Sequence, residues 1–216
     1  MEVYGTKPKR FTKEWREYFW DYYKWHTIAT IVAMIVIIST INDCVHRINY
    51  DLQIDYISEH MISDNASDAL RELIEEHIVD VGKNGSPEAY VKVIDMSENA
   101  DPQYTQAMYT KYSVEMAYTD SFVFILSKKY ADTLSEEEIF EKAESWTDVP
   151  SYNGYCINLE GCKALDELGI DTNDLYLGII KLRETKKESE RNNKLLQQEN
   201  GIRFANYLID SIEPKI

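Results

Sequence analysis

The chain has 216 residues and is acidic, with 38 Asp and Glu against 23 Lys and Arg and a formal net charge of −15. Residues 50–216 hold 33 of the acidic and 16 of the basic residues, so this part alone carries −17. Such a surface repels phosphate backbones and anionic lipid headgroups, which disfavours nucleic-acid binding and close contact with a bilayer surface.

The first predicted element is a transmembrane anchor at residues 27–43. The run Thr27–Ile41 contains no charge, Gly or Pro. It is short for a bilayer, which needs about 20 apolar residues, but the aromatic residues of 18–25 suit the headgroup layer and extend it. A buried core helix of a soluble protein is the alternative, and it predicts a polar stripe that this run lacks.

The orientation of the anchor follows from the basic residues on either side. Residues 1–26 carry six of the Lys and Arg, whereas Arg47 alone follows the anchor closely. Positive flanks stay in the cytoplasm, so we expect a cytoplasmic tail at 1–26 and an outside domain at 49–216 of a single-pass cell-membrane protein. A cleaved signal peptide is the alternative, although Ser39–Asp43 matches a cleavage site poorly.

Strands and helices alternate in the outside domain. Hydrophobic periodicity and turn residues predict strands at 51–57, 89–96, 121–127, 155–159 and 175–182. They predict helices at 67–81, 102–118, 135–146, 160–168 and 185–212, the last interrupted near Asn200-Gly201. This order indicates an α/β fold, a single three-layer domain with a mainly parallel sheet.

Two of these elements carry more detailed predictions. The run 121–127 is apolar on both faces, so Phe122, Phe124 and Leu126 should meet one helical layer and Val123 and Ile125 the other. The helix at 135–146 should begin at Ser135, followed by acidic residues in its first turn.

No catalytic motif is present. The four histidines match no zinc spacing, and no phosphate loop or nucleophile elbow occurs. Asp80–Gly85 has some features of a calcium loop but lacks two expected oxygen ligands, so a turn is favoured. We therefore expect a protein that is not an enzyme and holds no cofactor or metal.

Three cysteines occur. Cys156 and Cys162 are close enough in sequence for a disulfide across an intervening turn, and an extracytoplasmic location permits one. Two reduced thiols are the equal alternative. Cys44 would lie at the outer membrane interface.

Tyrosine is abundant, with 16 in the chain. Tyr152 and Tyr155 lie in a predicted loop and are candidates for ligand contact, since tyrosine offers a large contact area at small entropic cost.

Two resemblances follow from these residues. The segment 18–26, Tyr-Phe-Trp-Asp-Tyr-Tyr-Lys-Trp-His, with the apolar run after it, resembles the start of uncharacterised single-pass membrane proteins of Gram-positive, Clostridia-like bacteria. The layout of 51–127 is similar to the first lobe of type 2 periplasmic binding proteins. That resemblance implies solute binding, but the chain is too short for the second lobe that forms their cleft.

The sequence therefore predicts a membrane-anchored extracytoplasmic binding or interaction module. The alternative is an accessory or structural subunit of a membrane protein complex. Its expected partners are the bilayer, through residues 27–43, and an extracellular ligand or membrane protein. A concave pocket at the carboxyl ends of the strands would favour ligand binding, and a flat apolar patch would favour the subunit role.

Overall fold

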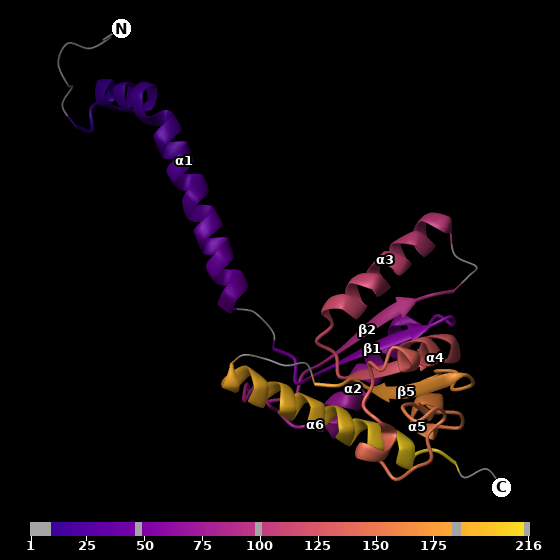
Figure 1. Cartoon of the computed structure of the whole chain (residues 1–216). Coiled ribbons are helices and arrows are strands. Elements are labelled where there is room, and N and C mark those ends of the chain that lie inside the picture. Colours follow the sequence, from indigo (N-terminus) through magenta and orange to yellow (C-terminus); the bar gives the residue numbers. More distant parts are fainter. Residues whose placement is uncertain (1–9, 46–48, 98–100, 183–186, 214–216) are drawn as a thin grey trace. The chain divides into compact units, whose positions relative to one another are not determined.

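The computed structural model describes residues 10–45, 49–97, 101–182 and 187–213. The chain divides into two compact units, Met1–Ile48 and Asn49–Ile216 (Figure 1). Each unit is described by itself. The side chain of Cys44 lies outside the described residues.

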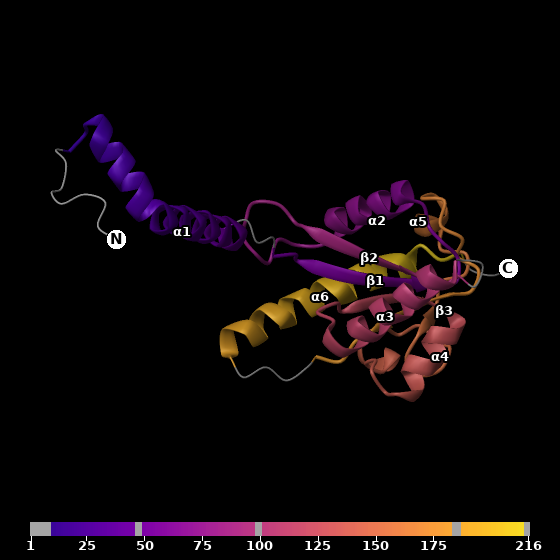
Figure 2. The same ribbon diagram turned by 90° about the horizontal axis from the view of Figure 1, so that it is seen from above.

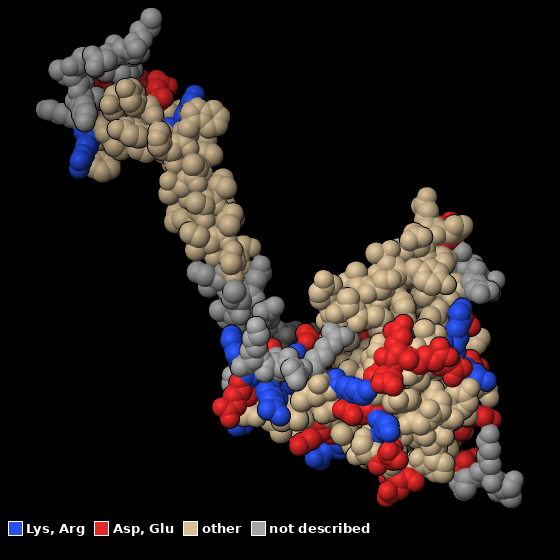
Figure 3. Space-filling view, in the orientation of Figure 1, with Lys and Arg blue, Asp and Glu red and all other residues tan. Residues whose placement is uncertain are grey.

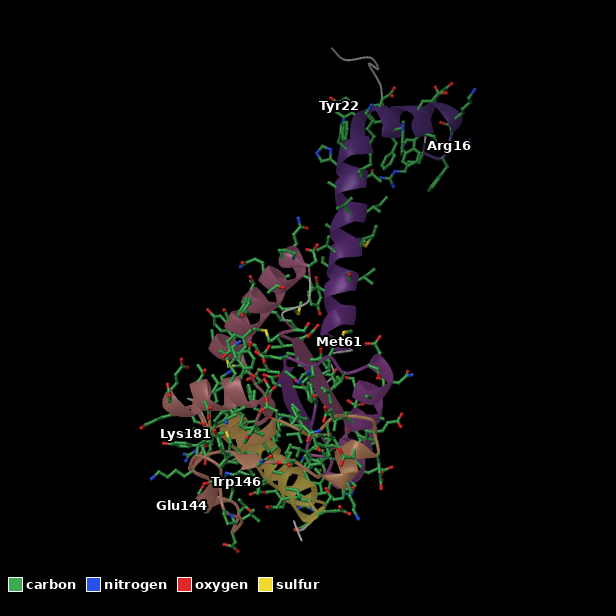
Figure 4. All side chains as sticks on the ribbon, turned by 90° about the vertical axis from the view of Figure 1, so that its right-hand side faces the viewer. Arg16, Tyr22, Met61, Glu144, Trp146 and Lys181 are labelled. Carbon is green, nitrogen blue, oxygen red and sulfur yellow. The ribbon has the colours of Figure 1, made fainter. Side chains whose placement is uncertain are left out.

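The first unit contains one long helix, α1 (Lys13–Val45), of 33 residues. Its segment Lys13–Thr40 is long and apolar enough to cross a membrane by length and composition, and none of it is buried in the protein. A bend separates a short aromatic segment of α1 from the apolar segment, with Arg16 on the aromatic segment and Tyr22 at the bend (Figure 4). An apolar N-terminal helix is thus confirmed, and its insertion in a membrane stays a prediction.

In the aromatic segment of α1, aromatic rings stack along one side of the helix. The ring of Phe19 lies 5.4 Å from that of Trp15 and 5.5 Å from that of Tyr23. These partners are four residues apart, the spacing that brings side chains together on a helix surface.

The second unit is built on a five-stranded sheet with the order β2-β1-β3-β5-β4. Its strands are β1 (Leu52–Ser58), β2 (Ala89–Asp95), β3 (Val123–Ser127), β4 (Ile157–Asn158) and β5 (Leu175–Ile179). β1 pairs in parallel with β2 and β3, whereas β5 is antiparallel to both β3 and β4.

The α/β class is confirmed, but a mainly parallel sheet describes only part of it. The connection from β4 to β5 contains α5 (Lys163–Asp166), which is only one helical turn. A parallel neighbour needs a long crossover, usually a full helix. The chain therefore returns beside β4 in the opposite direction.

Helices cover both faces of the sheet (Figure 2). α2 (Asp64–His77) and α6 (Glu188–Asp210) pack on one face, and α3 (Pro102–Tyr118) and α4 (Lys128–Glu136) lie on the other. α2 begins at Ser63, whose Oγ accepts a hydrogen bond from the Ala66 amide at 3.2 Å. Ala66, Leu70 and Ile74 then form a buried stripe at four-residue spacing, as an amphipathic helix requires.

The central strand β3 is buried on both faces as predicted. Val123 and Ile125 belong to the core under α2 and α6, and Phe124 and Leu126 belong to the core under α3 and α4. Phe122 lies in the first core, against the prediction, because it precedes the strand and does not follow its alternation.

The helix predicted at 135–146 is wrong in detail. The helix after β3 is α4, so Ser135 lies near its end and donates its hydroxyl to the carbonyl of Ala131 at 2.6 Å. Burial of Tyr130, Ala131 and Leu134 fixes this position. Of the predicted 135–146, only the last two residues of α4 and the 3-10 turn Ala143–Ser145 are helical.

The predicted interruption of the C-terminal helix is also wrong, because α6 continues through Asn200 and Gly201. The Asn200 side chain is buried and bonds the amide of Val79 at 3.1 Å and its carbonyl at 2.8 Å. At Gly201 a Cβ would lie 2.9 Å from Cγ2 of Val123. Both residues are therefore interior packing positions and not helix breakers.

Candidate functional site

The outer surface of α3 is the feature of the domain that packing does not explain. None of its 17 residues is fully buried, and large side chains lie exposed, Val114 by 55% and Tyr118 by 79%. Tyr104 and Tyr109 are also exposed. In Figure 3 the surface over α3 shows few charged side chains, whereas acidic and basic side chains are frequent on the surface below it.

The only two charged residues of α3 are both engaged. Lys111 donates from Nζ to the carbonyl of Val93 at 2.6 Å, and Glu115 pairs with Lys92 of β2 at 2.6 Å. The outward surface of α3, which we call the α3 face, is thus formed by Tyr104, Ala107, Tyr109, Val114 and Tyr118 together with neutral polar side chains.

Beneath the carboxyl half of α3 lies a buried charged cluster of Asp55, Lys92 and Glu115. The carboxylate of Asp55 is completely buried in β1, and its Oδ1 lies 3.8 Å from Lys92 Nζ. Lys92 and Glu115 are 19% and 12% exposed. Two hydroxyls complete the surroundings of Asp55, since Ser121 donates to it at 2.8 Å and Thr119 at 3.2 Å.

Burial raises the pKa of Asp55 to about 6, from an ordinary value of 3.8. The hydrogen bond from Ser121 and the charge of Lys92 lower this pKa, while the charge of Glu115 raises it further. Removal from water disfavours the charged carboxylate more than its partners favour it. The cluster therefore contains a carboxyl that takes up a proton near pH 6.

The two tyrosines that the sequence singled out occupy different environments. Tyr152 is 42% exposed. Its ring packs against that of Tyr176 in a tilted arrangement with the centroids 4.7 Å apart, and Lys128 Nζ lies 5.5 Å from the Tyr152 ring centre. Tyr155 is half-buried against the core under α3 and α4. The structure thus leaves Tyr152 as the accessible member of the pair.

The loop that carries these tyrosines is held in place by Asn153. Its Oδ1 accepts from the amides of Tyr155 at 3.2 Å and Cys156 at 3.0 Å, and its Nδ2 donates to Ser135 at 2.9 Å. The neighbouring Tyr152 raises the pKa of Lys128 above its ordinary value.

The disulfide considered for Cys156 and Cys162 is not formed, and both thiols are free and buried. Cys156 lies in the core under α3 and α4 and Cys162 in the core under α2 and α6. The two thiols therefore lie on opposite faces of the sheet. Burial raises the pKa of Cys156 to about 11, so its thiol is protonated at neutral pH.

The loop with partial calcium-site features is a turn. The carboxylate of Asp80 accepts backbone hydrogen bonds from Asn84 at 3.3 Å and Gly85 at 2.9 Å. Within the described part of the chain, no group of three His, Cys, Asp or Glu side chains is placed to hold a metal ion.

A small hollow lies beside the charged cluster, between the α3–β3 connection and α6. Its lining includes Thr119, Ser121, Lys194 and Lys181, the last labelled in Figure 4. Its volume is about 20 Å³, enough for a water molecule and too small for an organic ligand.

Comparison with known protein families, with curated proteins and with solved structures found no significant match for this chain.

Sequence reasoning missed both parts of this site. Asp55 alternates with apolar Ile54 and Tyr56, a pattern typical of a strand with one wet face, yet it is buried. The tyrosines of α3 at 104, 109 and 112 have a spacing that suits a helix facing the core, whereas 104 and 109 are exposed. The available signal was the near absence of charge over 102–118 in a domain this acidic.

Proposed function

We propose that this protein is a membrane-anchored interaction module whose extracytoplasmic domain binds a protein partner through the α3 face. The observation that carries the proposal is a 17-residue helix that buries none of its side chains fully and exposes Val114 and the tyrosines at 104, 109 and 118. Exposed apolar and tyrosine-rich patches mark protein interaction surfaces.

The charge distribution defines the chemistry of the partner. Residues 50–216 carry −17, while the Lys and Glu of α3 cancel each other and are both engaged. A strongly basic partner would favour other faces of the domain. The α3 face instead complements an uncharged surface of aliphatic and aromatic side chains, against which tyrosine contributes contact area and hydroxyl hydrogen bonds.

The alternative is an accessory subunit held permanently in a membrane complex. It is favoured by the exposed apolar side chains of the α3 face and by the small volume of the hollow beside the cluster. Tyr152, which packs against Tyr176 and lies near Lys128, supports a minor role in contact with a ligand. Anchoring by α1 would confine either kind of contact to the membrane plane.

The test is site-specific photo-cross-linking in native membranes. A photoreactive residue at Val114 should yield a covalent adduct with one defined protein. The same residue at Leu196, an exposed apolar position on α6, is the matched control and should yield none. Val114→Glu should abolish co-purification of that protein, and Leu196→Glu should not.

The outcomes separate the possible partners. An adduct of twice the chain mass identifies a second copy, and any other defined mass identifies a different protein. Equal labelling from both positions, or none from Val114, contradicts the proposal.

The proposed topology has its own test. Protease added to intact cells should remove the domain after residue 45 and leave the tail intact. Protection of the whole chain would show that the orientation is wrong.

A further inference from the structure

Polar contacts attach α3 to the sheet near its start, in its middle and in its carboxyl half. Tyr104 donates its hydroxyl to Asp95 at 3.2 Å near the start of the helix, and Lys111 donates to the Val93 carbonyl in the middle. The carboxyl half is attached by Glu115, through Lys92. Apolar contact comes from the partly buried side chains of Met108, Tyr112 and Met116.

The attachment at the carboxyl half contains an unequal number of charges. Two carboxylates, Asp55 and Glu115, share one ammonium group, that of Lys92. When both carboxyls are ionised, this nearly dry cluster has one negative charge in excess. A single bound proton removes it.

Geometry identifies the carboxyl that takes the proton. Lys92 Nζ lies 2.6 Å from Glu115 and 3.8 Å from Asp55, so Glu115 holds the stronger ion pair. Asp55 is also the more deeply buried of the two. The neighbouring residue of β3 is Phe124, and the nearby Asp120 is exposed and pairs with Lys194. Glu115 and Lys92 are therefore the charged groups that face Asp55.

We propose that proton occupancy of the Asp55–Lys92–Glu115 cluster controls how firmly the carboxyl half of α3 is held on the sheet. With the proton bound, Asp55 keeps its contacts with Ser121 and Thr119, and its repulsion of Glu115 disappears. Without the proton, the excess negative charge disfavours the seated helix. Acidification thus closes α3 and a rise in pH loosens it.

The pKa of Asp55 places this change in a defined range. It is raised to about 6 when α3 is seated and returns toward its ordinary value when α3 moves and water reaches the carboxyl. Linkage between these two values makes the opening of α3 about tenfold more favourable at pH 7.5 than at pH 5. The consequence for partner binding rests on the proposed function of the α3 face.

The experiment is hydrogen–deuterium exchange of the full chain in detergent micelles at pH 5 and 7.5, with labelling times scaled for the intrinsic effect of pH. Amides of the carboxyl half of α3 should exchange about tenfold faster at pH 7.5. Those of α2, on the opposite face, provide the reference. No partner is present, so the result is independent of whether a partner is found.

Variants decide whether the cluster is the cause. Asp55→Asn cannot ionise and should remove the pH effect on α3. The matched control is Asp95→Asn, which weakens the Tyr104 attachment and should leave the pH effect unchanged. Glu115→Gln gives Lys92 to Asp55 alone and should move the transition to lower pH. Absence of a transition in the natural chain, or its persistence in Asp55→Asn, would overturn the inference. If Asp55→Asn does not fold, a transition in Glu115→Gln at the same pH as in the natural chain would overturn the inference.

Discussion

Relative to the natural domain, the Asp55→Asn variant should be more stable at neutral pH than it is at acidic pH. Asp55 is fully buried, and its pKa is raised from 3.8 to about 6. Between these values the folded state binds the proton more tightly than the unfolded state. The contribution of Asp55 to the free energy of unfolding therefore decreases as the pH rises through this window and is constant above it.

The magnitude follows from the same shift. About two pKa units correspond to about 3 kcal/mol, at 1.36 kcal/mol per unit. Asn cannot ionise, so the free energy of unfolding of Asp55→Asn minus that of the natural domain should increase by up to about 3 kcal/mol from pH 3.5 to pH 7. Asn can still accept a hydrogen bond from Ser121 or Thr119, and its amide can donate to the other hydroxyl.

Urea unfolding of a fragment comprising residues 49–216 measures this difference. Trp146 is its only tryptophan and is almost fully buried, so its fluorescence reports unfolding. Asp120→Asn is the control, since that carboxylate is exposed and its ion pair with Lys194 contributes little. A difference that does not vary with pH would refute the account of the buried charge.

Two further changes test the framework of the domain. Asp51→Ala should lower the free energy of unfolding by about 2–4 kcal/mol in the same urea assay. The buried carboxylate of Asp51 accepts hydrogen bonds from three backbone amides of 81–88 at 2.7–2.8 Å. The control is Asp80→Ala, in an exposed turn, which should lower the free energy of unfolding much less. Gly201→Ala would stabilise an ordinary helix by about 1 kcal/mol, but the close approach to Val123 should reverse the sign and lower the thermal midpoint. Stabilisation by Gly201→Ala would show that the core yields there.

The sequence predicted the layout of the domain well wherever burial has a simple period. The strand 121–127 is apolar at every inner position and lies at the centre of the sheet. α2 shows a clear stripe of Leu70 and Ile74. Such periodicity shows which side of an element faces the core. Burial of apolar side chains in that core is the dominant favourable energy in folding.

The failures occurred where tertiary contacts outweigh local preference. Ser135 precedes three glutamates, a good helix start in isolation, yet packing of Tyr130 and Leu134 places the helix before it. Asn200 and Gly201 disfavour a helix in isolation, but Asn200 bonds the backbone of Val79 in the folded domain. The direction of β5 was missed for a similar reason, because its reversal depends on how short α5 is and not on any residue of β5.

The candidate site was the least predictable part because it depends on what lies beneath a helix. A stretch of tyrosines at 104, 109 and 112 has the composition of a core-facing helix, and only Tyr112 of these three is partly buried. Polar groups of the sheet, above all Asp55, take the place that apolar side chains would fill. A helix attached in this way is less firmly held than one with an apolar underside, since buried charges stabilise poorly. The apolar part of the attachment comes from the partly buried Met108, Tyr112 and Met116. Weak polar attachment inside and an uncharged tyrosine surface outside are thus properties of one element, and both favour a helix whose position changes when it binds.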